Sequence, residues 1–206
     1  MSTLQARIYL ASKSPRRREL LRQIGVHFDL LIFRGGERGE DGDVDETPLP
    51  DEAVEHYVER VALTKAEAGS RRLQWRMLPR HPVLAADTSL ELDGGIIGKP
   101  VDADDAAAIL RQLSGRSHRV LTAVAMSDGT RTRSRISVSE VRFRELAETE
   151  IRQYVASGEP MDKAGAYGIQ GRAAVFIEEI RGSYTGIMGL PLFETAQLLD
   201  TFGYPL

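Results

Sequence analysis

Short apolar runs of strand length alternate along this chain with segments whose apolar residues recur at helical spacing. This alternation predicts an α/β fold, because neither kind of element can bury its apolar side without the other. No repeat, low-complexity tract or linker interrupts the alternation, so residues 1–206 are predicted to form a single domain around one mixed sheet. The expected strands are residues 6–12, 27–33, 81–92, 96–100, 118–128, 135–143 and 173–180, and the expected helices are residues 15–24, 51–72, 103–113, 149–157 and 193–202.

Charge and composition exclude several classes of function. The net charge is −3, so no general basic field favours nucleic acid or an anionic membrane surface. There is no cysteine, which excludes disulfides, thiolate metal ligands and a cysteine nucleophile. The apolar runs fall short of the ~20 residues that span a bilayer, and the first residues lack the pattern of a secretory signal. We therefore expect a cytoplasmic protein without a membrane or nucleic-acid partner.

Lysine is scarce among the 27 basic residues, since only four lysines occur and the rest are arginine. Where arginine has replaced lysine elsewhere, a remaining lysine marks a position that needs a compact ammonium group, unless the four are scattered by chance. The four are Lys13, Lys65, Lys99 and Lys163.

The sequence LASKSPRRRELL places a strand, a tight turn and the start of a helix in succession. Ser14 is the expected N-cap and Pro15 the first helical residue. Free amides at such a helix start bind phosphate, and Ser12, Arg16 and Arg17 would add a hydroxyl and two guanidinium groups. The alternative is an ordinary capped surface helix with solvated arginines.

In LAADTSLELDGGIIGKP, Asp87 ends an apolar run and Lys99 follows across the turn at Asp93 and Gly94. The hairpin returns Lys99 to the neighbourhood of Asp87, where a carboxylate beside a lysine suits a phosphate held by a metal ion. The alternative is a structural ion pair. GGIIGKP is not a P-loop, because the four-residue spacer and the final Ser or Thr are missing, and the four histidines lack ligand spacing.

Glycines crowd the sequence DKAGAYGIQGRAAVFIEEIRGSYTGIMGLPL around Lys163 and Gln170. Glycine lets the backbone approach a ligand closely, although bulges and turns of an edge hairpin would explain the same pattern.

Seven short motifs taken in order resemble the Maf family of nucleoside triphosphate pyrophosphatases over nearly the whole chain. They are L-A-S-x-S-P-R-R, D-E-T, A-D-T, G-K-P, L-S-G-x-x-H, K-A-G-A-Y-G-I-Q-G and G-L-P. The resemblance implies an elongated mixed sheet flanked by helices, with two lobes around a cleft, as in inosine triphosphate pyrophosphatases. It also implies a homodimer and hydrolysis between the α and β phosphates, giving a nucleoside monophosphate and pyrophosphate.

By the same resemblance, the proton acceptor is Asp87, and the substrate-binding residues are Ser12, Arg17, Lys65, Lys99 and Lys163. The cofactor implied is a divalent cation, Mg²⁺ with Mn²⁺ or Co²⁺ as alternatives, bound by Asp87 and Glu46. The acidic stretch before Glu46 is longer than the family pattern, so Asp43 and Asp45 remain alternative ligands.

Arg16, Thr88 and Gln170 match the positions at which branches of the family differ, and they resemble the dTTP/UTP pyrophosphatase branch. We therefore expect them to set the base specificity. The alternatives are a nucleotide-binding regulator of septum formation and an enzyme that removes modified pyrimidine nucleotides.

Overall fold

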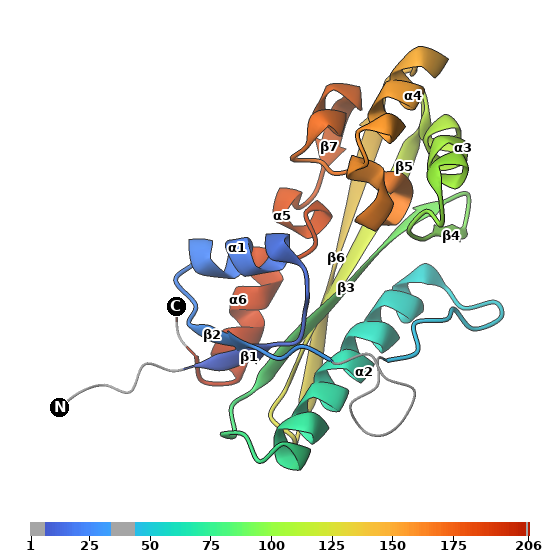
Figure 1. The fold of residues 1–206 in the computed structure, drawn as a ribbon. Coiled ribbons are helices and arrows are strands. Elements are labelled where there is room, and N and C mark those ends of the chain that lie inside the picture. Colours follow the sequence, from blue (N-terminus) through green and yellow to red (C-terminus); the bar gives the residue numbers. More distant parts are fainter. Residues whose placement is uncertain (1–6, 34–43, 205) are drawn as a thin grey trace.

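The computed structural model describes residues 7–33, 44–204 and 206, and these form a mixed α/β structure built on one sheet (Figure 1). The strands follow the order β2-β1-β3-β5-β6-β7, with β4 paired to β3 beside this path. Pairs β1–β2 and β1–β3 are parallel, and the pairs formed by β3–β4, β3–β5, β5–β6 and β6–β7 are antiparallel. The strands are β1 (Ile8–Leu10), β2 (Phe28–Leu30), β3 (Val83–Leu92), β4 (Gly95–Ile97), β5 (Ser117–Ser127), β6 (Thr132–Phe143) and β7 (Ile177–Arg181).

The helices cover different parts of this sheet. They are α1 (Pro15–Gln23), α2 (Val54–Trp75), α3 (Ala103–Leu113), α4 (Glu148–Ala156), α5 (Tyr184–Ile187) and α6 (Leu192–Thr201). The 3-10 segments are η1 (Glu159–Asp162), η2 (Ala164–Ala166) and η3 (Arg172–Phe176). Their starts follow local chemistry, since Ser14 accepts from the Arg17 amide at α1 and Asp102 accepts from the Asp105 amide at α3.

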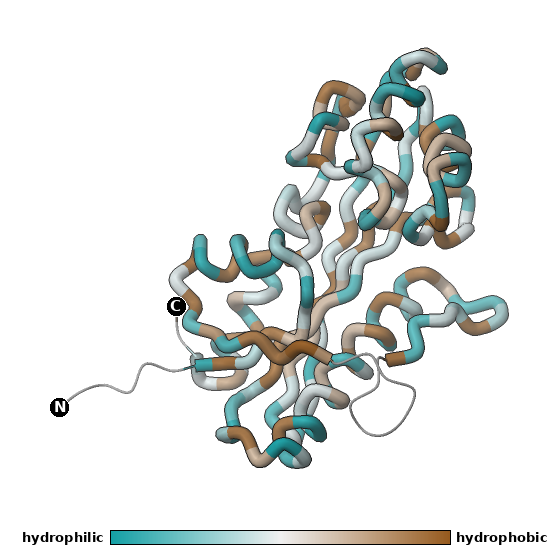
Figure 2. The backbone as a smooth tube through the Cα atoms, in the orientation of Figure 1, coloured by the Kyte–Doolittle hydropathy of each residue, from teal (hydrophilic) through white to brown (hydrophobic). Residues whose placement is uncertain are grey.

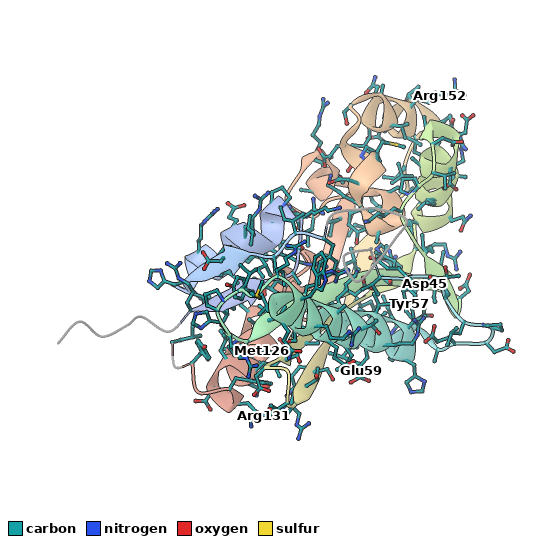
Figure 3. All side chains as sticks on the ribbon, turned by 60° about the horizontal axis from the view of Figure 1, so that its bottom comes forward. Asp45, Tyr57, Glu59, Met126, Arg131 and Arg152 are labelled. Carbon is teal, nitrogen blue, oxygen red and sulfur yellow. The ribbon has the colours of Figure 1, made fainter. Side chains whose placement is uncertain are left out.

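The buried apolar side chains form three clusters, of which two belong to the first lobe of the molecule and one to the second lobe. One cluster packs α2 on the β3–β5 sheet and a second packs α1 and α6 on the opposite face. The third lies further along the same long strands, under α3, α4, η2 and η3. Figure 3 labels Arg131 near one end of the molecule and Arg152 near the other, so the sheet is elongated and spans both lobes. This architecture confirms the predicted fold.

Most of the predicted strands extend beyond the observed ones, and in two of them the additional residues have another place in the fold. Residues 27–33 were expected as one strand, but β2 ends at Leu30 and residues 31–33 line the cleft described below. Figure 2 shows the hydrophobic character of this segment. Residues 173–176 belong to η3 and not to β7, because the Ala174 amide closes a turn on the Gly171 carbonyl and both Ala173 and Phe176 are buried. Two inward positions three residues apart suit a 3-10 turn better than a strand.

Candidate active site

A cleft of about 650 Å³ lies at an open edge of β3, between the two lobes. On this edge β1 pairs with Val83 and Leu84, and β4 pairs only from Leu90 onward. The intervening stretch of β3, which includes Asp87 and Thr88, has no paired strand on that side among the described residues. The interruption of the sheet edge therefore makes room for a ligand.

Asp87 and Thr88 point to opposite faces of β3, as successive strand residues must. Asp87 faces α2, where it meets Lys65, and Thr88 faces α1, where it meets Arg17. Both residues line the cleft, because the unpaired edge is open to both faces. Groups from two helices on opposite sides of the sheet thus converge on one space.

Lys65 joins the two acidic residues of the site. Its Nζ donates to Asp87 Oδ1 at 2.9 Å and lies 2.9 Å from Glu46 Oε1. The Lys65 and Asp87 side chains are only 14% and 9% exposed, so this ion pair is largely shielded from water. Lys99 lines the same cleft, as the hairpin predicts, but the lysine paired with Asp87 is Lys65.

The segment before α2 presents Glu46, and not Asp45, to this pair. Asp45 Oδ1 accepts from the Thr47 amide at 2.9 Å, so Asp45 closes a local turn. Tyr57, which Figure 3 labels close to Asp45, donates its hydroxyl to the Glu46 carbonyl at 2.8 Å. Burial, and then the charges of Asp87 and Glu46, raise the pKa of Tyr57 to about 12. The alternative ligand Asp43 lies outside the described residues.

The two carboxylates fit one divalent cation of the magnesium type. The described residues contain no group of three or more acidic or histidine side chains that could enclose a metal by themselves. Mg²⁺ is commonly held by one or two carboxylates together with waters and substrate phosphates. Asp87 and Glu46, both within 2.9 Å of one ammonium group, supply such an incomplete set of oxygen ligands.

Arg17 is fixed in the cleft wall by three acceptors. Its Nε donates to the Gly189 carbonyl at 2.7 Å, its Nη2 to Thr88 Oγ1 at 3.3 Å and its Nη1 to Ser12 Oγ at 3.4 Å. Burial lowers the pKa of Arg17, and the charge of Asp87 opposes this effect. Arginine remains protonated in proteins, so a positive charge lines the cleft, and two of its five N–H groups have no hydrogen-bond partner within the described residues.

Across the cleft, Asp162 lies between two cations. Lys163 Nζ donates to Asp162 Oδ1 and to the Glu159 carbonyl, each at 2.6 Å. Arg16 Nη1, from the other lobe, lies 3.6 Å from Asp162 Oδ2. Sequence reasoning missed Asp162, although its position directly before Lys163 was a usable signal.

The glycine-rich segment after Lys163 forms the remaining wall. Gly165 adopts φ +72°, and a Cβ there would lie 2.1 Å from Leu90 Cδ2. Gln170 is exposed at the cleft. Lys99 is exposed too and makes no ion pair or hydrogen bond within the described part of the chain.

All ten predicted site residues line this one cleft. They are Ser12, Arg16, Arg17, Glu46, Lys65, Asp87, Thr88, Lys99, Lys163 and Gln170. Sequence reasoning did not identify Tyr57, which is buried on α2 and lines the same cleft. The cleft therefore brings several cationic side chains together with a carboxylate pair at one side, which makes it a candidate anion-binding site.

Comparisons with known proteins agree with this geometry. The family model described as "Maf-like protein" matches residues 7–202. A protein of Aromatoleum aromaticum named dTTP/UTP pyrophosphatase is 82% identical over 206 residues, which cover all of both chains. A Dechloromonas aromatica protein with the same name is 60% identical over 198 residues, covering 96% of this chain and 98% of that protein.

Solved structures support the fold. The Ham1 protein of Staphylococcus aureus has a TM-score of 0.53 at 18% identity and covers 95% of this chain and 97% of its own. A HAM1 protein of Coxiella burnetii has a TM-score of 0.52 at 16% identity, covering 96% and 100%. Within the described residues, no helix has both the length and the apolar character to cross a bilayer.

Proposed function

Because this chain belongs to the Maf-like protein family, we propose that it hydrolyses nucleoside triphosphates, preferentially dTTP and UTP, to the nucleoside monophosphate and pyrophosphate. The observation that carries the proposal is the single cleft in which two carboxylates and several cations meet. The choice of substrate is supported by the name of the relatives of this chain, dTTP/UTP pyrophosphatase.

In the proposed reaction, Asp87 accepts a proton from the attacking water, and the bond between the α and β phosphates breaks. Arg17, Lys65, Lys99 and Lys163 balance the charge of the triphosphate and of the departing pyrophosphate. Ser12 adds a hydroxyl at the start of α1. Asp87 and Glu46 would hold a divalent cation, Mg²⁺ with Mn²⁺ or Co²⁺ as alternatives, which supplies positive charge to the phosphate oxygens when bound.

Base preference is assigned to Arg16, Thr88 and Gln170, since cations that hold phosphates cannot distinguish bases. Gln170 offers an amide donor and a carbonyl acceptor, which match the imide edge that thymine and uracil share. Residues 31–33 supply an apolar wall of the cleft on which a base could pack. Cytosine reverses part of that edge and would leave an amide group unpaired.

The proposal also includes a cytoplasmic homodimer. Apolar side chains on adjoining elements support the dimer, because Val138 on β6, Tyr184 on α5 and Phe193 on α6 are 45%, 47% and 70% exposed. Sedimentation analysis of the purified protein tests it, and a monomer at micromolar concentration would contradict it.

The test of substrate choice is kcat/KM for dTTP, UTP, CTP, GTP and ATP with the wild type and Gln170→Glu. We expect a preference of roughly tenfold or more for dTTP and UTP over CTP, which Gln170→Glu reduces more than it lowers the best remaining turnover. Wild-type preference for purines would overturn the substrate assignment, and absence of turnover would favour a nucleotide-binding regulator.

A further inference from the structure

Thr122 lies behind the cleft, in the middle of β5, and is fully buried. It does not line the cleft, but it stands directly opposite Thr88 in the β3–β5 register. The two hydroxyl oxygens are 3.0 Å apart. A polar side chain in the apolar run of β5 requires a hydrogen-bond partner, and this pair supplies one.

The hydrogen bonds around Thr122 fix which hydroxyl donates to which. Thr122 Oγ1 lies 2.8 Å from the Gly186 carbonyl, which can only accept, so the single Thr122 proton is used there. The Thr88 hydroxyl must therefore donate to Thr122 Oγ1. Arg17 Nη2, 3.3 Å from Thr88 Oγ1, can only donate. The chain of donors runs from Arg17 through Thr88 and Thr122 to Gly186.

This direction leaves Thr88 as an acceptor toward the cleft. Its one proton is committed to the sheet, so it cannot donate to a phosphate oxygen, and it can always receive a hydrogen bond from Arg17. The same network also binds the turn around α5 through two carbonyl groups. The Gly186 carbonyl accepts from Thr122, and the Gly189 carbonyl accepts from Arg17. Through Thr88, Thr122 thus supports one of the three acceptors that orient the guanidinium group.

We infer that Thr122 is a positioning residue for substrate phosphate: by holding the Thr88 proton, it keeps Thr88 as an acceptor for Arg17 and so fixes the orientation of this guanidinium group, which lines the cleft. The inference rests on the proposed function, in which Arg17 binds the triphosphate. Because phosphates are common to all substrates, Thr122→Val raises KM for every nucleotide and leaves the order of preference among bases unchanged. Thr88→Val also changes that order, because Thr88 is one of the residues to which base preference is assigned.

The test is a double-mutant cycle with Thr122→Val, Thr88→Val and the double variant, measured as kcat and KM for dTTP and CTP. We expect each single variant to raise KM roughly fivefold with kcat nearly unchanged, as lost ground-state binding does. The double variant should be no worse than Thr88→Val, because Thr122 acts only through Thr88. Thr122→Ser, which keeps the hydroxyl, should stay within about twofold of the wild type.

Thr195→Val is the matched control. Thr195 is also fully buried, and its hydroxyl donates to the Pro191 carbonyl at 2.7 Å within α6. It should lower the Tm about as much as Thr122→Val and leave KM unchanged. Should Thr122→Val fail to fold, Thr122→Ala, which leaves room for a water at Gly186, takes its place in the cycle.

Calorimetric binding of inorganic tripolyphosphate gives a readout that does not depend on turnover. We expect Thr122→Val to weaken it by the same factor as it raises KM. Equal effects of Thr122→Val and Thr195→Val, additive losses in the double variant, or no rescue by serine would overturn the inference. A wild type that binds tripolyphosphate without hydrolysing dTTP would instead overturn the proposed function, and the binding measurements would still test Thr122.

Discussion

Asp87 and Glu46 both pair with the ammonium group of Lys65, and the two carboxylates differ in their exposure to solvent. Lys65 keeps both carboxylates within 2.9 Å of its Nζ, which offsets their repulsion before a cation or a substrate arrives. Asp87 is the more buried of the two acids, and Glu46 lies at the exposed end. The geometry favours Asp87 as the proton acceptor and Glu46 as a supporting ligand.

Asp87→Asn tests the proposed base directly. The amide keeps the size of the side chain but cannot accept the proton of water, so we expect turnover to fall ~10²–10⁴-fold with folding retained. Turnover is measured at saturating Mg²⁺, so that a weaker affinity for the metal is not mistaken for lost catalysis. Near-normal activity would reduce Asp87 to a structural role.

Lys99→Arg tests whether the scarce lysines mark the site. Lys99 makes no ion pair within the described residues, so the Tm of the Lys99→Arg variant should equal that of the wild type. A longer, planar guanidinium at the cleft should nevertheless lower kcat/KM roughly tenfold or more. Arg111→Lys is the control, since Arg111 pairs with Glu148 on the exposed surface. Wild-type kinetics of Lys99→Arg would refute the lysine argument.

At the scale of elements, local chemistry predicted much of the fold. The cap at Ser14 and the turn at Asp93 and Gly94 both lie where the sequence placed them. Residues 173–176 could not be assigned correctly from their apolar composition, because η3 begins where the Arg172 amide donates to the Glu159 carboxylate, 13 residues earlier in the chain. The sequence likewise could not show that Asp87 pairs with Lys65 and not with Lys99, because this ion pair depends on how α2 packs across the sheet.

The segment around η2 offers a test of how closely the cleft wall is packed. Gly165 and Gly158 have nearly the same backbone conformation, at φ +72° and +73°. A Cβ at Gly158 meets nothing within 4 Å, whereas one at Gly165 would lie 2.1 Å from Leu90. Gly158→Ala should therefore cost about 1 kcal/mol of unfolding free energy, from the backbone alone, and Gly165→Ala about 2 kcal/mol more.

Urea unfolding measures both variants. An equal loss of unfolding free energy in the two variants would show that the segment beside Lys163 and Gln170 rearranges to accept a methyl group. That result would contradict the tight packing of η2 on Leu90.

At the scale of the whole molecule, the long strands join two lobes, and buried side chains of the second lobe reach the cleft from behind. Tyr167 lines the cleft and pairs with His118 on β5 at 2.8 Å. The sequence excluded the histidines as a metal-ligand set and singled out the ten residues that line the cleft. Thr122 could not be found in this way, because its hydroxyl has partners far away in the chain.

His118 makes stability depend on pH. Burial lowers its pKa to about 4 in the folded protein, against 6.5 for the ordinary group. The unfolded chain therefore binds a proton first, and the stabilisation present above pH 6.5 is lost as the pH falls toward 4. We expect the wild type to lose about 3 kcal/mol more than His118→Gln between pH 7 and pH 4 in urea unfolding. Parallel curves would contradict the burial of a neutral imidazole.

The central claim is that the cleft separates the α and β phosphates of a pyrimidine triphosphate. It is tested most directly by ion-exchange analysis of an early time point with dTTP and Mg²⁺, run alongside Asp87→Asn. We predict equal amounts of dTMP and pyrophosphate from the wild type and almost none from the variant. Accumulation of dTDP and inorganic phosphate, or the same products at the same rate from Asp87→Asn, would contradict the account.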